Sequence, residues 1–347
     1  MKNLKEIAQE LGVSASTVSY VYHDKWRAKA ISQKMADRVM AKLREEQVLP
    51  SMLGLQLRSG STKTVGILLP NLKMPYFLQL LSGMQDALSR EKYLLILGNC
   101  PRTDPALQSE FFDTMANRSA DRVILSPLPA KGLHEEIERL RARNIPVVFV
   151  NNYLSDYKIP FAVTDNRWGA YQLVRHVLDS GHERILFMGR TPEVAIFADR
   201  YAGYCDALTE AGAKVSRKDV FWYNQLQEKY LSALYDRLNG RNKPDAIFFD
   251  SLLTSGDVID MIYDSLHLRH PEDILLCGFD QPMGLFLKKS FRETILAPLP
   301  SVRQDAERMG ALAAELVLHG TVDGQQATSA LVRPFLSWKM EEPLEFF

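Results

Sequence analysis

The sequence predicts an α/β protein with a small helical head, a short hinge and a two-lobed body. Its 347 residues exceed the usual size of one domain, and 46% of them are hydrophobic, enough for a sizeable core. Residues 1–49 carry apolar side chains at helical spacing, whereas from residue 64 onward short apolar strands alternate with amphipathic helices. We therefore expect domains at 1–49 and 64–347, joined by a hinge at 50–63.

Charge is unevenly distributed along the chain. Lys+Arg and Asp+Glu both number 42, but residues 1–63 hold eleven basic against six acidic side chains. Residues 1–63 thus have a net charge of +5 and the remainder −5. A basic head on an acidic body suggests that a polyanion binds at the head only. A basic surface without a partner would show the same excess.

Cysteine usage and hydropathy exclude several protein classes. Cys100, Cys205 and Cys277 lie far apart, with no CxxC motif and no histidine nearby at metal-ligand spacing. No disulfide framework, metal site or cofactor is therefore predicted. The amino terminus lacks the apolar core of a signal peptide, and no run approaches the ~20 apolar residues of a membrane span. We expect a cytoplasmic protein.

Three apolar-periodic stretches make up the head. The first ends at Gly12, Ser14 is a natural N-cap for a second short helix, and Ser32 is one for a third. The small Ala8, four residues before Gly12, suits two helices that cross at a sharp angle. The apolar positions are Leu4, Ile7, Ala8, Leu11, Val18, Val21, Ile31, Met35, Val39, Met40 and Leu43. This pattern predicts a helix-turn-helix.

Exposed positions of the second helix are short or hydrogen-bonding, as a helix needs to be if it enters a DNA major groove. They are Ser14, Ala15, Ser16, Thr17, Ser19, Tyr20 and His23. Any small three-helix unit is the alternative. The basic excess, the Ala–Gly spacing and the position at the start of the chain favour DNA binding.

The hinge has an unusual concentration of leucines. Pro50 stops the third helix and Ser51 offers a new N-cap, after which Leu53 and Leu57 lie one turn apart within Met52–Arg58. Seven residues are about half the length at which an isolated helix is stable in water. Two such segments could pair across a dimer and press leucines into a minor groove, whereas a plain solvated connector is the alternative.

Parallel sheets built from βαβ units are predicted for the body, and two sets of strands indicate two lobes with a cleft between them. The expected strands are 65–69, 93–97, 122–126 and 147–150, then 161–164, 185–189, 246–249 and 274–279. The expected helices lie near 76–91, 105–118 and 132–143, then 168–180, 199–212, 226–239 and 253–266.

Polar side chains follow several of these strands, where ligands of parallel sheets bind. Asn151-Asn152, Asp165-Asn166, Asp250-Ser251 and Asp280-Gln281 stand at strand ends, and Arg200 lies early in a helix. Carboxylates, amides and one arginine around Tyr76, Phe77 and Trp168 suit a polyol or sugar. Each residue taken alone is more often a strand-end cap or surface group.

No catalytic motif is present: GxGxxG, GxxxxGK[ST], HExxH and GxSxG are all missing. Asp250 and Asp280 could form an acid/base pair, so the runner-up function is a sugar-acting α/β enzyme with an added DNA-binding head. A secreted solute-binding protein is a third reading, disfavoured by the head and by the missing signal peptide. Binding without catalysis is favoured.

These segments together resemble the lactose-repressor (LacI/GalR) family of bacterial transcription regulators. The similarity is strongest in LKEIAQELGVSASTVSYV (4–21), the step into the hinge at 49–51, and VGILLPNLKMPYF (65–77). Further matches are IPVVFV (145–150), VTDNRWG (163–169), SGHERILFMG (180–189), RYAGY (200–204), CGFD (277–280) and SVRQD (301–305).

The resemblance implies a homodimer that binds a pseudo-palindromic operator, and a periplasmic-binding-protein type I body with three crossovers. Its lobes would comprise about 64–160 with 293–320, and 161–292 with 321–340. It also implies that Ser14, Ala15, Ser16, Thr17, Ser19 and His23 face bases or phosphates, Ser32 contacts a phosphate and Leu57 is the wedge leucine. The implied effector contacts are Arg200 and Asp280, with Asp250, Asn151 and Phe77 beside them.

Several positions depart from the family pattern. Tyr20 stands where arginine is usual and His23 where asparagine is, so the operator sequence does not carry over. Gly54 stands where alanine is common, which predicts a hinge that is less ordered off DNA. The loop at 24–30 is longer and more basic than usual. We expect an effector-responsive regulator, a repressor of carbohydrate-utilisation genes with a sugar as its effector. A nucleoside and a phosphorylated sugar are the alternative effectors.

Overall fold

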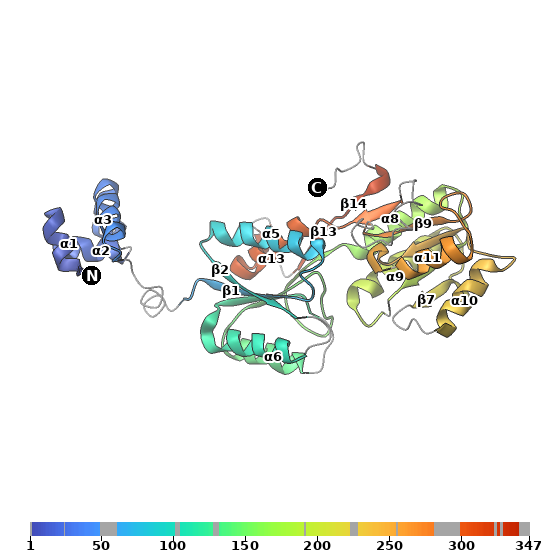
Figure 1. Ribbon diagram of the computed structural model, residues 1–347, viewed down its shortest axis with the longest axis horizontal. Helices are drawn as coiled ribbons and strands as arrows, with labels where there is room; N and C mark the ends of the chain where they lie inside the picture. Colours follow the sequence, from blue (N-terminus) through green and yellow to red (C-terminus); the bar gives the residue numbers. More distant parts are fainter. Residues whose placement is uncertain are drawn as a thin grey trace. The chain divides into compact units, whose positions relative to one another are not determined.

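The chain divides into two compact units, Met1–Thr64 and Val65–Phe347 (Figure 1). The computed structural model describes residues 2–23, 25–48, 61–100, 105–127, 132–190, 192–222, 228–254, 256–280, 299–322, 325–326 and 329–339. The predicted hinge helix, with Gly54 and Leu57, lies outside these residues.

The head consists of three α-helices, α1 (Leu4–Leu11), α2 (Ala15–Tyr22) and α3 (Gln33–Glu45), with a 3₁₀ turn, η1 (Arg27–Lys29), between the last two. Asn3 begins α1 with a reciprocal capping box with Glu6. The predicted caps Ser14 and Ser32 accept hydrogen bonds from backbone N–H groups three residues ahead. Gly12 ends α1 with a φ of 65°, a left-handed conformation that favours glycine.

The apolar faces of the three helices meet in one small core, in which Ile7, Val18, Val39 and Leu43 are fully buried. Lys42 adds an ionic tie between α3 and α1, because its ammonium lies 3.2 Å from Glu10 and 2.9 Å from Glu46. The periodicity of the sequence therefore predicted the head's helices and its buried positions.

The body contains two six-stranded sheets (Figure 1). The first has the order β13-β5-β4-β3-β1-β2 and the second β14-β10-β9-β8-β6-β7. The first-sheet strands are β1 (Thr64–Leu69), β2 (Leu94–Asn99), β3 (Arg122–Leu125), β4 (Val147–Val150), β5 (Phe161–Thr164) and β13 (Ser329–Val332). The second-sheet strands are β6 (Ile185–Gly189), β7 (Val220–Trp222), β8 (Ala246–Phe249), β9 (Leu275–Phe279), β10 (Ser301–Arg303) and β14 (Phe335–Leu336). A separate two-stranded ribbon joins β11 (Thr321–Val322) and β12 (Gln325–Gln326).

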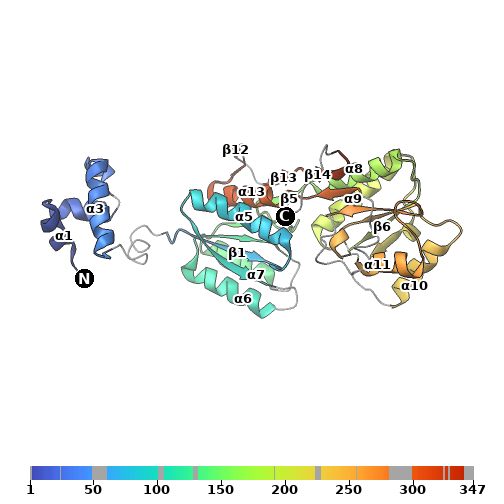
Figure 2. The same ribbon diagram turned by 45° about the horizontal axis from the view of Figure 1, so that its top comes forward.

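Helices cover the faces of both sheets. Figure 2 shows α5 (Pro75–Arg90) and α13 (Ala306–His319) on one face of the first sheet, with α6 (Pro105–Thr114) and α7 (Leu133–Ala142) on the other. The second lobe contains α8 (Asn166–Asp179), α9 (Ala195–Glu210), α10 (Glu228–Asn239) and α11 (Gly256–Asp260). Short π-helical stretches, Met115–Ser119 and Met261–Ser265, extend α6 and α11. No helix among the described residues is long and apolar enough to span a bilayer.

Some strands belong to a different lobe from the one that the predicted boundaries gave them. β5, expected to open the second lobe at residue 161, pairs with β4 and β13 in the first sheet. β10, expected in the first lobe, pairs with β9 in the second sheet. The chain therefore crosses between lobes after β5, after β10 and between β13 and β14. Strand pairing is a long-range contact, and an apolar strand of three or four residues does not encode its partner.

Two glycines permit the close packing of α5 against α13. A Cβ at Gly83 would lie 1.9 Å from the carbonyl oxygen of Glu307, and one at Gly310 would lie 2.1 Å from that of Leu80. The helix backbones consequently approach more closely than alanine would allow. This contact fixes α13 on the first lobe and, with it, the position at which β10 leaves the second.

Candidate functional site

A cavity of about 590 Å³ lies between the two lobes of the body. The first lobe lines it with residues that follow β1 and β4 and that begin α5. The second lobe contributes residues that follow β6, β8 and β9 and that begin α9. The carboxyl ends of parallel strands from both sheets thus converge on one cavity, as expected for ligand sites of such sheets.

Tyr76 and Asn151 lie on the first-lobe wall and are hydrogen-bonded to each other. The Tyr76 hydroxyl donates to Asn151 Oδ1 at 2.8 Å, and Asn151 Nδ2 donates to Ser126 Oγ at 3.0 Å. Burial, followed by the charge of Asp280, raises the pKa of Tyr76, so the hydroxyl remains a protonated donor. Asn151 has a φ of 65°, a left-handed conformation that asparagine tolerates better than most residues.

Gln304 connects the two lobes at the end of β10. Its Nε2 donates to Asp280 Oδ1 at 2.8 Å, and its Oε1 accepts from Thr164 Oγ1 at 2.8 Å. The second oxygen of Asp280, Oδ2, accepts from Ser251 Oγ at 3.3 Å. Asp280 is therefore held in place by neutral donors.

Arg200 is almost completely buried, with 2% of its surface exposed. Its Nε donates to Asn166 Oδ1 at 2.7 Å, and its Nη1 donates to the backbone oxygen of Asp250. The guanidinium lies 3.9 Å from the centre of the Phe279 ring, a cation–π contact. Burial lowers the pKa of Arg200, and the charges of Asp280 and Asp250 oppose that shift.

Most of the predicted effector residues meet in this cavity. It is lined by Tyr76, Phe77, Asn151, Arg200 and Asp280. Their role as effector contacts stays a prediction.

Two predicted residues, Asp250 and Trp168, are not among the described residues that line the cavity. The Asp250 carboxylate is fully buried and accepts the backbone N–H of Arg190 at 2.7 Å, so it joins two strand ends. Trp168 packs with the core of the second lobe, with the Arg333 guanidinium 4.4 Å from its ring. The sequence placed both residues near a strand end, but it did not show in which direction either side chain points.

Several lining residues were not singled out from the sequence, among them Lys73, Arg190, Asn152 and Gln304. Asn152 was noted only as part of a polar strand end, although its Oδ1 is buried without a hydrogen-bond partner. Arg190 directly follows Gly189 at the end of β6, so its place after a predicted strand could have marked it as a candidate ligand contact. Gln304 follows a strand of three residues, too short to be recognised by periodicity.

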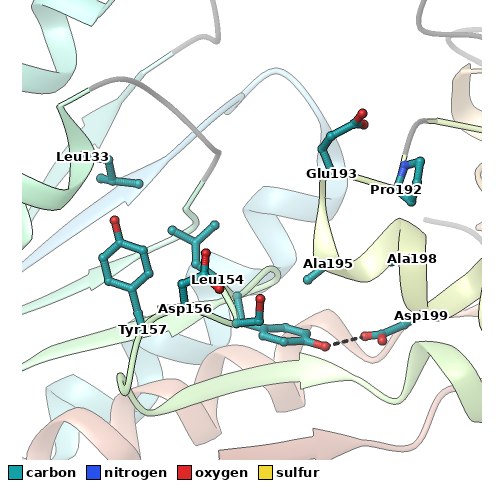
Figure 3. A pocket seen from close by; sticks show the side chains of 11 residues that line it. Leu133, Leu154, Asp156, Tyr157, Pro192, Glu193, Ala195, Ala198 and Asp199 are labelled. Carbon is teal, nitrogen blue, oxygen red and sulfur yellow. Dashed lines mark hydrogen bonds between the residues drawn. The ribbon is translucent and has the colours of Figure 1, made fainter.

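A second cavity of about 510 Å³ lies beside the loop between β4 and β5 (Figure 3). Tyr153 and Tyr157 line it from the first lobe, and Glu193 and Asp199 line it from the second. The Tyr153 hydroxyl donates to Asp199 Oδ2 at 3.0 Å, which joins the lobes directly. Burial raises the pKa of Asp199, although the hydrogen bond from Tyr153 opposes the shift.

In the head, the predicted DNA-facing residues Ser14 to His23 extend along α2 from its N-cap to its C-cap. Ser14, Ala15 and Ser16 are exposed, whereas Thr17, Ser19, Tyr20 and His23 are half-buried. Ser14 Oγ both caps the helix and lies 2.8 Å from Thr17 Oγ1.

The basic loop after α2 brings two cations onto aromatic rings. Lys29 Nζ lies 5.5 Å from the centre of the Tyr20 ring, and the Arg27 guanidinium lies 4.6 Å from that of Trp26. Positive charge thus stands next to the helix that the sequence predicts to read DNA.

Both parts of the chain match family models. Residues 3–51 match the model "Bacterial regulatory proteins, lacI family", and residues 62–257 match "Periplasmic binding proteins and sugar binding domain of LacI family". The HTH-type transcriptional repressor PurR of Erwinia tasmaniensis is 27% identical over 325 residues, which cover 92% of this chain and 90% of the relative. Catabolite control protein A of Priestia megaterium is 27% identical over 314 residues, which cover 90% of each chain.

Solved structures share the fold. A complex of the transcriptional regulator CelR with cellobiose matches with a TM-score of 0.64 and 21% identity, covering 97% of this chain and 98% of CelR. CcpA of Lactococcus lactis matches with a TM-score of 0.63 and 23% identity, covering 79% of this chain and 96% of CcpA. The chain therefore belongs to the LacI family, and it is a DNA-binding transcriptional regulator rather than an enzyme.

Proposed function

We propose that this regulator is a repressor of carbohydrate-utilisation genes whose operator binding responds to a sugar in the interlobe cavity. The observation that carries the proposal is the position of Gln304. Its side-chain amide bonds to Thr164 in the first lobe and to Asp280 in the second, at the cavity wall. A ligand that exchanges hydrogen bonds with this amide would alter how the lobes are held together.

The polar groups of the cavity suit a polyhydroxylated ligand. Tyr76, Asn151 and Asp280 present donors and acceptors close to the apolar rings of Phe77 and Phe197. Sugar hydroxyls both donate and accept, while their C–H faces pack on aromatic rings. We propose Tyr76, Phe77, Asn151, Arg200 and Asp280 as effector contacts.

We further propose that the head reads a pseudo-palindromic operator in the cytoplasm, where bacterial DNA lies. The second helix would enter the major groove with Ser14, Ala15 and Ser16 first, since these are its exposed leading residues. Tyr20, with Lys29 beside its ring, would contact bases or phosphates, as would Thr17, Ser19 and His23. Ser32 would contact a phosphate, and Gly54 and Leu57 would belong to the hinge.

A homodimer is supported by apolar side chains exposed on the first lobe. Leu78 of α5, Leu94 and Leu97 of the edge strand β2, and Leu107 of α6 are between 37% and 59% exposed. A contiguous exposed apolar patch typically marks an interaction surface, and we propose that these leucines belong to one. A second copy covering this surface would bring two heads together for one operator.

The effector would act through the lobes. A change in lobe orientation would alter the separation of the two first lobes across the dimer, and hence whether the paired hinges can form on DNA. Two sites and two states make this coupling allosteric, with a typical magnitude of about 1–3 kcal/mol.

Operator binding in the presence of candidate effectors tests the proposal. Genomic fragments selected by the purified protein would serve as DNA, and fluorescence anisotropy would report affinity with and without a panel of sugars. We expect one sugar to change the operator Kd by about 5- to 150-fold. An operator Kd that no member changes, although one of them binds the protein, would reject effector control.

A further inference from the structure

The wall of the interlobe cavity carries an excess of positive charge. Among the described residues that line it, Lys73, Arg190 and Arg200 are cationic and Asp280 is the one carboxylate. The Asp280 oxygens already accept hydrogen bonds from Gln304 and Ser251. The buried Asp250 carboxylate, outside the lining, also acts on Arg200, so the positive charges of the lining outnumber these two carboxylates by one.

Two of the cations lie near the same aromatic ring. The Arg190 and Arg200 guanidinium carbons lie 4.6 Å and 5.9 Å from the centre of the same ring, that of Phe197. The charge of Arg190 adds to the burial that lowers the pKa of Arg200, as expected for like charges in a shielded site. An anion between or beside them would relieve this repulsion.

The lobes also direct two helix amino termini toward the cavity. The N-cap residues of α5 and α9, Met74 and Val194, both line it, and neither makes a side-chain capping bond. The first turns of both helices therefore place partial positive charge at the cavity, which favours an anion. Pro75, the first residue of α5, has no N–H, and the N–H groups of Phe77 and Phe197 donate to the carbonyls of Met74 and Val194.

Asn152 supplies an independent indication of a bound ligand. Its residue surface is 1% exposed, it lines the cavity, and its Oδ1 has no hydrogen-bond partner, whereas its Nδ2 donates to the Pro127 carbonyl at 2.7 Å. An unpaired buried acceptor is costly and needs a donor, such as a hydroxyl group.

We propose that the effector is a sugar bearing an anionic group, a phosphate or a carboxylate, with Lys73 and Arg190 binding the anion and Asn152 accepting from a hydroxyl. This inference rests on the function proposed above. Lys73 follows β1 in the first lobe and Arg190 follows β6 in the second, so one anion attracts both lobes. The charge of the anionic group would thereby distinguish this effector from a neutral sugar and draw the two lobes toward each other.

Inorganic phosphate is the first probe, applied to the full-length protein at constant ionic strength with chloride as the balancing anion. We expect phosphate to raise the melting temperature, and Lys73→Gln and Arg190→Gln each to weaken its apparent affinity about tenfold, the effect of one lost charged hydrogen bond. Lys214→Gln is the matched control, since Lys214 is exposed and outside the cavity lining. It should leave the response unchanged.

Glucose, glucose 6-phosphate and glucuronate then distinguish the sources of charge. Stronger stabilisation by the phosphate or by the carboxylate identifies the anionic group. No response to phosphate, or equal responses in Arg190→Gln and Lys214→Gln, would overturn the inference.

The inference and the proposed function fail in different ways. A neutral sugar that changes operator affinity while the anions do not bind would overturn the anionic effector and leave effector control standing. Anion binding that depends on Lys73 and Arg190 but never changes operator affinity would support the site and reject its regulatory role.

Discussion

Tyr153 of the first lobe and Asp199 of the second are joined by a hydrogen bond of 3.0 Å from Oη to Oδ2. The Tyr153 ring stacks on Phe161 with 4.7 Å between centroids, so its hydroxyl is held by the first-lobe core. Asp199 lies in the first half of α9, one residue before Arg200. Lobe orientation is therefore coupled to the helix that carries the buried arginine of the cavity.

We expect ionisation of Asp199 to lower the free energy of unfolding of the protein as the pH rises. Because burial raises its pKa above 3.8 in the folded protein, its contribution is fully present below 3.8 and is lost as pH rises through the raised value. Asp199→Asn keeps an acceptor for Tyr153 and removes the charge. We expect the variant to melt at a higher temperature than the wild type at neutral pH and at a similar temperature below 3.8.

Asp206→Asn is the control for this pH series, since the hydrogen bond from Arg167 lowers the Asp206 pKa. The stability that Asp206 contributes is therefore present at neutral pH and is lost as pH falls. Asp206→Asn should melt at a lower temperature than the wild type at neutral pH, the opposite of Asp199→Asn. Identical pH profiles for wild type and Asp199→Asn would contradict the role of Asp199.

Arg200→Ala should weaken effector binding and destabilise the body. Its removal leaves Asn166 Oδ1 and the Asp250 carbonyl without their donor, at a cost of roughly 1–3 kcal/mol for each buried group that stays unsatisfied. Calorimetric titration of the effector and urea unfolding would measure the two effects. Operator affinity without effector should change little, and an unaltered effector affinity would remove Arg200 from the site.

Leu57→Ala should weaken operator binding and leave effector affinity nearly unchanged. The prediction follows from the leucine wedge that the hinge sequence indicates, where apolar insertion between base steps supports a bent DNA. Anisotropy with operator DNA and titration with effector are the two measurements. Equal loss of both affinities would count against the hinge.

Gly83→Ala should destabilise the body by roughly 1–3 kcal/mol, as overpacking does. The added Cβ would lie 1.9 Å from the carbonyl oxygen of Glu307, which belongs to a helix backbone and cannot rotate away. Gly256→Ala is the matched control, because a Cβ there meets nothing within 4 Å. Urea midpoints of the two variants measure the difference, and equal midpoints would show that α5 and α13 can separate without loss.

The sequence by itself determined the helices of the head and most strands of the body. Helix periodicity, the serines at positions 14 and 32, and Gly12 act within a few residues, so they can be read without knowing the fold. The same is true of β4, β5, β6 and β8, whose predicted bounds agree with the structure. Convergence of Tyr76, Asn151, Arg200 and Asp280 was predictable because carboxyl ends of parallel strands meet at one edge.

Only the tertiary structure decided which lobe holds β5, β10 and β13, and which strand-end residues face the cavity. The Asp250 carboxylate accepts the backbone N–H of Arg190, because a buried N–H group needs a hydrogen-bond partner. Arg190 itself lines the cavity, whereas Asp250 does not. The cationic character of the site likewise emerged only when Lys73 and Arg190, 117 positions apart in the sequence, came to line one space. Such pairings depend on contacts between distant segments, which local patterns do not record.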